Sequence, residues 1–76
     1  MRTVYISLPT VESVQSFVGK ISGLEGNFDL LSGDYIVDAR SLMGIFSLDL
    51  SKPLELVVEN DTAEAMRAIA RFITDN

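Results

Sequence analysis

The chain has 76 residues, with 6 lysines and arginines against 11 aspartates and glutamates, so its formal net charge is −5, and it contains no histidine and no cysteine. These counts exclude disulfides, thiolate zinc sites and imidazole chemistry, and the acidic balance argues against nucleic-acid binding. Hydrophobic residues make up 47% of the chain, which is typical of a globular protein, and we expect one domain over residues 1–76. No apolar run is long enough for a membrane span or resembles a signal peptide, so we expect a cytoplasmic protein by default.

The first part of the chain predicts a strand followed by a helix. Residues 3–8 alternate between apolar and polar side chains, and Pro9 ends this strand because proline cannot donate to a ladder. Apolar residues then recur at intervals of three and four through residues 10–22, which predicts a helix with Thr10 as its N-cap. Gly19 costs this helix about 1 kcal/mol relative to alanine, so we expect a close neighbour there. The expected inward stripe is Val11, Val14, Phe17, Val18 and Ile21.

The middle of the chain predicts a hairpin and a short helix. Residues 27–31 and 35–37 are short β segments, and the Ser-Gly-Asp sequence between them is a turn signal. Residues 41–48 then carry apolar side chains at helical spacing, and Ser41 stands where an N-cap is expected.

The last part predicts a strand and a C-terminal helix. Residues 54–59 alternate again, and Asp61 and Glu64 have the spacing of a capping box, with aspartate in place of serine or threonine. The expected inward stripe of the following helix is Ala65, Met66, Ile69, Phe72 and Ile73.

These elements follow the order β-α-β-β-α-β-α. An open-faced sandwich is expected, which is an α+β fold in which three helices cover one face of a four-stranded antiparallel sheet. The expected core is Val4, Ile6, Val14, Phe17, Val18, Phe28, Leu30, Ile36, Leu56, Val58, Met66, Ile69 and Ile73.

Carboxylates are scattered over the predicted strands and turns, which favours a solvated surface over a metal site. The members of this group are Asp29, Asp34, Asp38, Asp49, Glu55, Glu59 and Asp61. Ser51 and Lys52 are adjacent on a turn and therefore do not form a catalytic dyad. We expect no catalytic residue, no metal, no cofactor and no enzymatic activity; a small carboxylate enzyme is the weaker alternative.

One segment is more specific. Residues 40–48 read Arg-Ser-Leu-Met-Gly-Ile-Phe-Ser-Leu. This resembles the second-helix segment of HPr, the histidine-containing phosphocarrier of the bacterial sugar phosphotransferase system, where family members read Lys-Ser-Ile-Met-Gly-(Val/Leu)-Met-Ser-Leu. The basic residue, both serines, the Met-Gly pair and the last leucine match, and the predicted element order is also that of HPr. The resemblance implies an HPr-like fold over the whole chain.

The histidine that defines the HPr family is missing. Family members carry Gly-(Leu/Ile)-His-(Thr/Ala)-Arg-Pro at the start of the first helix, and that histidine receives the phosphate. Here Thr10 falls near the histidine position and Glu12 near the arginine position, where an acid repels phosphate. The resemblance therefore implies a degenerate former phosphate site at Thr10 and Glu12, without histidine phosphocarrier activity; Thr10 is read as a helix cap.

Ser41 is the candidate that remains. The chain is similar to catabolite-repression HPr, which lacks the histidine and keeps a serine phosphorylated by a dedicated kinase, so the resemblance implies that Ser41 is a regulatory phosphorylation site. The simpler interpretation is that Ser41 only caps its helix. Leu42, Met43 and Phe46 are candidates for partner docking, with the alternative that Phe46 packs under the turn at residues 52–53.

We therefore expect a regulatory or protein-interaction protein of the sugar phosphotransferase or carbon-regulation type, with protein partners and neither nucleic acid nor membrane. Its expected partners are an HPr-type kinase, a transcription regulator or a phosphotransferase component. The alternative is a competitor or accessory protein that binds enzyme I or the sugar-specific carriers without transferring phosphate.

Overall fold

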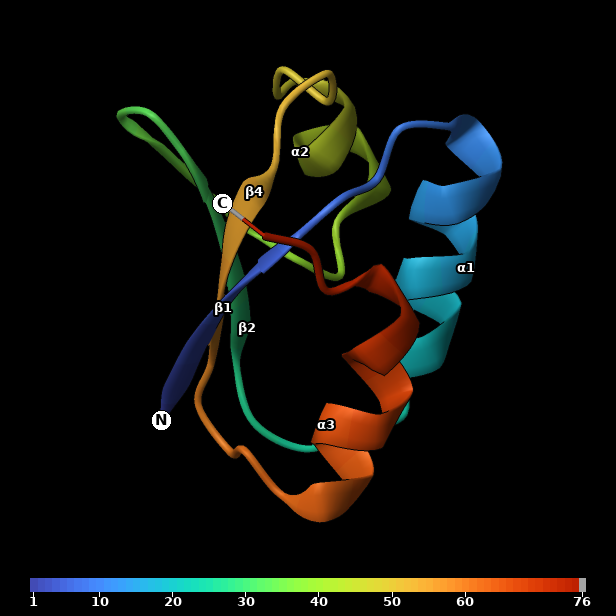
Figure 1. Cartoon of the computed structure of the whole chain (residues 1–76), viewed down its shortest axis with the longest axis vertical. Coiled ribbons are helices and arrows are strands. Elements are labelled where there is room, and N and C mark those ends of the chain that lie inside the picture. Colours follow the sequence, from blue (N-terminus) through green and yellow to red (C-terminus); the bar gives the residue numbers. More distant parts are fainter. Residues whose placement is uncertain (76) are drawn as a thin grey trace.

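The computed structural model describes residues 1–75, and its strands and helices follow one another in the predicted order (Figure 1). The strands are β1 (Arg2–Ile6), β2 (Phe28–Ser32), β3 (Tyr35–Asp38) and β4 (Leu54–Val58); the helices are α1 (Val11–Ile21), α2 (Leu42–Phe46) and α3 (Ala63–Ile69), followed by a 3₁₀ turn, η1 (Ala70–Phe72). Each boundary lies within about two residues of the one that the sequence pattern predicts, except that α3 ends at Ile69, four residues before the end of the predicted stripe.

The four strands form one antiparallel sheet in the order β1-β4-β2-β3. In the central register, Leu56 of β4 lies opposite Val4 of β1 and Leu30 of β2. All three helices lie on the same side of this sheet, and its other face is open (Figure 1). The predicted α+β open-faced sandwich is therefore confirmed.

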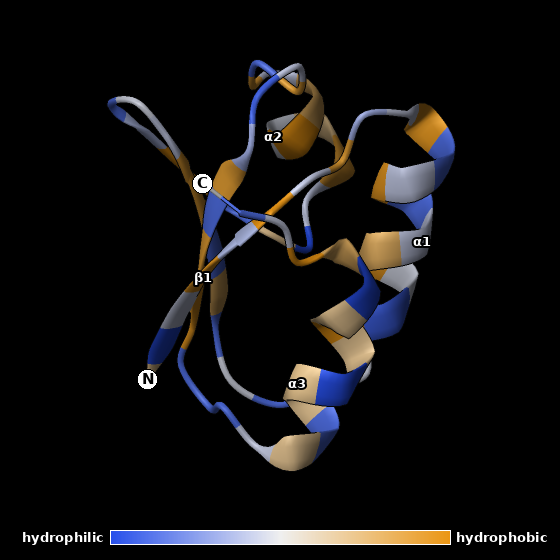
Figure 2. Cartoon of the chain, viewed as in Figure 1, coloured by the Kyte–Doolittle hydropathy of each residue, from blue (hydrophilic) through white to orange (hydrophobic). Residues whose placement is uncertain are grey.

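The core fills the space between the sheet and the helices. Figure 2 shows hydrophobic and hydrophilic residues alternating along α1 and α3, as amphipathic helices covering a sheet require. The buried apolar residues are Ile6, Leu8, Val14, Phe17, Ile21, Phe28, Leu30, Ala39, Ile45, Leu48, Leu54, Leu56, Val58, Ala65, Ile69 and Phe72, and Val4, Val18 and Met66 pack against them half-buried. The rings of Phe17 and Phe72 meet edge to face, with centroids 5.4 Å apart, which ties α1 to the C-terminal segment.

Three residues that the sequence pattern assigns inward are exposed instead. Val11, Ile36 and Ile73 leave 54%, 69% and 43% of their surface exposed. Val11 is the first residue of α1 and lies at the end of the stripe, beyond the core. Ile36 pairs with Leu31, which alternates with the buried Leu30, so both lie on the open face. Ile73 follows η1, where the chain has left α-helical geometry and the helical period no longer holds.

The helix caps follow the prediction at α1 and differ from it at α3. Thr10 caps α1, since its hydroxyl accepts a hydrogen bond from the amide of Ser13 at 3.0 Å. The predicted cap at Asp61 is wrong, because the hydroxyl of Thr62 accepts from the amide of Ala65 at 3.1 Å and thus caps α3. Both residue types cap well, and only the backbone shows where the helix begins.

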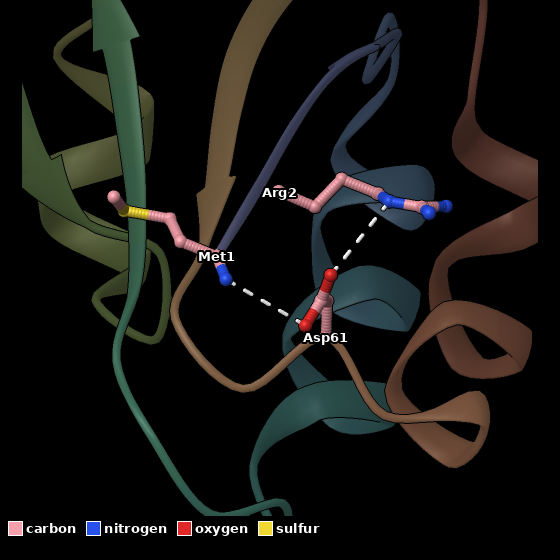
Figure 3. A network of polar contacts seen from close by, with 3 residues as sticks. All are labelled: Met1, Arg2 and Asp61. Carbon is pink, nitrogen blue, oxygen red and sulfur yellow. Dashed lines mark ion pairs between the residues drawn. The ribbon is translucent and has the colours of Figure 1, made fainter.

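Asp61 has a different role, which is to hold the start of β1. Its carboxylate lies 3.6 Å from the amino group of Met1 and 3.8 Å from Nε of Arg2 (Figure 3). The pairs are exposed, so they contribute about 1 kcal/mol or less to stability.

The expected close neighbour of Gly19 is absent, because a Cβ built there meets no atom within 4 Å. No helix among residues 1–75 combines the length and the apolar character that crossing a membrane requires.

Candidate functional site

The segment that carries the sequence motif forms α2, a helix of five residues. Its N-cap is Ser41, and Ser47 ends it with an amide that donates back to the carbonyl oxygen of Gly44 at 3.2 Å. Ile45 is the one residue of α2 that is buried. Ile45 therefore anchors the helix in the core, while Leu42, Met43 and Phe46 are partly or largely exposed.

Gly44 lets α2 lie close to β3. A Cβ placed on Gly44 would come within 3.2 Å of both the Cβ of Val37 and the Oγ of Ser41, which is tighter than an ordinary van der Waals contact. The glycine in the motif is thus explained by packing. Its absent side chain makes room for the strand below and for the cap beside it.

The Ser41 hydroxyl is exposed and occupied by one local hydrogen bond. Its Oγ accepts from the amide of Gly44 at 3.1 Å, while its own amide donates to the carbonyl oxygen of Asp38 at 2.9 Å. The predicted cap is confirmed. The hydroxyl hydrogen has no fixed acceptor within the described residues, and the atom that would attack a phosphoryl group is accessible.

Leu42, Met43 and Phe46 form the exposed apolar side of α2, which we call the α2 patch. Their exposed fractions are 40%, 83% and 42%. Phe46 is thus partly covered and partly exposed, which fits both a docking role and packing under the turn at residues 52–53. Apolar side chains clustered on a short helix are more typical of a contact surface than of a solvated one.

Arg40 does not face this surface. One of its guanidinium nitrogens donates to the carbonyl oxygen of Leu24 at 2.5 Å, and the guanidinium carbon lies 4.9 Å from the centroid of the Phe28 ring. The side chain therefore joins the segment before α2 to the loop between α1 and β2. Its charged group is bonded within the fold and is not presented beside the α2 patch. Sequence reasoning missed this role because the acceptor lies 16 residues away in the chain.

Capping bonds occupy the start of α1, where the resemblance to HPr predicts a degenerate phosphate site at Thr10 and Glu12. The Thr10 hydroxyl accepts from the amide of Ser13, and the Ser13 hydroxyl in turn accepts from the amide of Thr10, both at 3.0 Å. Glu12 is exposed on the same turn. A first-turn amide that would meet an anion is therefore already bonded, and the nearest side-chain charge is negative.

This turn and α2 lie at the same end of the molecule (Figure 1), and the two helices contact each other. Val11, exposed in the first turn of α1, adds an apolar side chain to this end, and the sequence pattern had placed it inward. A Val directly after an N-cap is the signal that could have shown it, because the first turn of a helix often extends past the core.

The carboxylates are dispersed. Among residues 1–75 no group of three or more acidic side chains is close enough to hold a metal ion. Asp34 and Asp49 line one open cleft of about 480 Å³ together with Lys52. Hydrogen bonds from the hydroxyl and the amide of Ser51 lower the pKa of Asp49 below its usual value, so this carboxylate is bonded locally.

The chain matches no protein-family model, and comparisons with curated proteins and with solved structures gave no significant match.

Proposed function

We propose that this protein is a regulatory interaction domain of the HPr type, which works through Ser41 and the α2 patch and does not transfer phosphate through histidine. The observation that carries the proposal is the exposure of α2. Only Ile45 of this helix is buried, while the cap hydroxyl and all three residues of the α2 patch are accessible.

The resemblance of residues 40–48 to HPr supports the same surface, because four of the six matching residues, Ser41, Met43, Gly44 and Ser47, belong to α2 and its caps. The fold adds support at a coarser level, since an open-faced sandwich with this element order presents α2 beside the start of α1. A chain without histidine has no group for the family's relay reaction, so any function that it shares with the family must be one of recognition.

The chemistry proposed for Ser41 is phosphoryl transfer from ATP. A bond forms between Oγ and the γ-phosphorus, the bond to ADP breaks, and the hydroxyl proton passes to the base of the kinase. The product adds about −1.5 to −2 charges beside the α2 patch. Because the guanidinium of Arg40 is bonded to the carbonyl oxygen of Leu24, it does not pair with the new charge, and a basic site on a partner can bind it.

The phosphorylation is tested with a purified HPr kinase and ATP, followed by intact mass measurement and peptide mapping. One phosphate on Ser41 is expected. Ser47→Ala is the matched control, since Ser47 is an exposed serine at the opposite end of the same helix and its loss should leave the modification intact, whereas Ser41→Ala should abolish it. No mass increase, or an increase retained in Ser41→Ala, removes the regulatory site from the proposal.

The docking role is tested separately with Met43→Ala and Phe46→Ala. Binding to an HPr-type kinase, a catabolite-repression regulator, enzyme I and the sugar-specific carriers is measured by calorimetry. We expect at least one of these partners to bind and to lose about tenfold or more in affinity with the double variant. Binding of enzyme I alone supports the competitor function. If the double variant binds every partner as tightly as the unmodified chain does, the docking role of the α2 patch is rejected.

A further inference from the structure

The two edge strands of the sheet differ in whether another segment pairs with them. At the β1 edge the C-terminal segment adds a short pairing, in which Ile73 bridges Ile6 and the amide of Thr74 donates to the carbonyl oxygen of Tyr5 at 2.9 Å. The β3 edge has no such cover among residues 1–75, since β3 is the last strand of the sheet. In Figure 1 the β2–β3 hairpin projects away from the helices.

The backbone groups that this edge offers can be identified. The amide of Ala39 donates to the carbonyl oxygen of Phe28 at 2.8 Å, so Ala39 belongs to the set of residues whose polar groups face β2. In an antiparallel ladder that set alternates, which places the N–H and C=O of Ile36 and the N–H of Asp38 on the outer side. An added strand would find three backbone partners there.

The side chains on this edge are apolar and acidic. Tyr35 and Ile36 are 71% and 69% exposed. Asp38 lies directly opposite Asp29 across β2 and β3, an arrangement of like charges that destabilises a sheet unless it is neutralised. Asp34, in the adjacent turn, and Lys52 line the same cleft. The two ion pairs of the described residues both involve Asp61, so neither of them neutralises Asp29, Asp34 or Asp38.

We propose that the β3 edge binds an extended, basic segment of a partner protein by strand addition. Charge complementarity selects this occupant. A second copy of the chain would bring a net charge of −5 to an edge that is already acidic, whereas a basic strand neutralises the Asp29–Asp38 pair. This surface is separate from the α2 patch and does not depend on the function proposed above.

The register defines what the segment must carry. On the open face, one cross-strand row runs through Glu55, Leu31 and Ile36, and the next runs through Val57, Asp29 and Asp38. An added strand therefore places an apolar residue beside Ile36 and a lysine or arginine beside Asp38, two positions apart. The recognised pattern is basic-x-apolar in an antiparallel strand and apolar-x-basic in a parallel one.

The probe is the labelled peptide Thr-Lys-Thr-Val-Thr-Lys-Thr, which satisfies both directions, with a control peptide in which both lysines are glutamates. Fluorescence anisotropy gives the affinity, and amide chemical shifts locate the contact. We expect the lysine peptide to bind and to shift and protect the amides of Ile36 and Asp38. The glutamate peptide should not bind.

Ile36→Pro removes the outward N–H without removing a bond to β2, and Ile36→Thr is its control because it keeps the N–H. The proline variant should bind the lysine peptide at least about fivefold more weakly than the threonine variant does. Asp38→Asn keeps the oxygen that accepts from the Arg40 amide and should lower the affinity about two- to fivefold. Asp75→Asn, after the segment at the opposite edge, is the charge control and should have no effect.

Three results would overturn the proposal: no binding of the lysine peptide, binding that Ile36→Pro leaves at the level of Ile36→Thr, or self-association in light scattering that Ile36→Pro abolishes. The last result assigns the edge to a second copy. The α2 variants Met43→Ala and Phe46→Ala should leave peptide binding unchanged, so failure at one surface is distinguished from failure at the other.

Discussion

The Oγ of Ser41 accepts a hydrogen bond from the amide of Gly44 at 3.1 Å, so the proposed phosphorylation site is also the cap that begins α2. This bond satisfies one of the free amides at the start of a helix that is only five residues long. The stability of α2 and the chemistry of Ser41 are therefore linked, and substitutions can separate them.

Removing the Ser41 side chain should destabilise the protein. Ser41→Ala leaves the Gly44 amide without its partner, and we expect the free energy of unfolding to fall by about 1 kcal/mol. Ser41→Asp replaces the hydroxyl with a carboxylate that caps equally well and should stay within about 0.5 kcal/mol of the unmodified chain. Urea unfolding followed by circular dichroism measures both, and an aspartate variant as unstable as the alanine variant would contradict the capping role.

The two helical glycines should respond oppositely to alanine. Gly19→Ala adds a Cβ where no atom lies within 4 Å, and the gain in helix propensity should stabilise the protein by about 1 kcal/mol. At Gly44 the same methyl group meets Val37 and the Ser41 cap at 3.2 Å, which should cancel that gain or reverse it. Thermal unfolding of the two variants side by side provides the comparison, and equal stabilisation would reject the close packing of α2.

Arg40 should contribute to stability. Arg40→Ala removes the hydrogen bond to Leu24 and the contact with the Phe28 ring, and we expect the free energy of unfolding to fall by about 1–2 kcal/mol. Arg67→Ala, an exposed arginine on α3, is the matched control and should change it by less than about 0.5 kcal/mol. Similar losses in the two variants would show that the contacts of Arg40 add nothing.

The carboxyl of Asp49 should titrate below the usual range for an aspartate, because the hydroxyl and the amide of Ser51 stabilise its charged form and lower its pKa. A lowered folded-state pKa stabilises the fold above the unfolded pKa, and this contribution is lost as the pH falls through the folded value. Ser51→Ala should raise the pKa of Asp49 towards its ordinary value, as measured by NMR titration of the side-chain carboxyl carbon. An unchanged titration would show that the Ser51 hydroxyl does not contribute.

Sequence periodicity predicted the strands, the helices and the covered face because each depends on neighbours along the chain. Periodicity failed where the outcome depends on contacts between different elements. Ile36 alternates correctly within its strand, but only its pairing with Leu31 shows that it faces away from the helices. Asp61 and Thr62 can both cap a helix, and only the backbone shows that α3 begins after Thr62.

The candidate site was predictable in part. Ser41 and the residues of α2 could be identified from their spacing and from a resemblance, and their exposure could not. The role of Arg40 required the three-dimensional contact with Leu24, and the open edge of β3 required the strand order. Both features arise from segments that are distant in the chain, which a single sequence does not bring together.

The position of β4 between β1 and β2 has a consequence for synthesis of the protein. Strand β1 has no partner strand until Leu54–Val58 has also emerged from the ribosome, whereas the β2–β3 hairpin can close as soon as its turn is made. During translation, β1 therefore stays unpaired while α1, the hairpin and α2 are made, and formation of the sheet depends on contacts of long sequence separation.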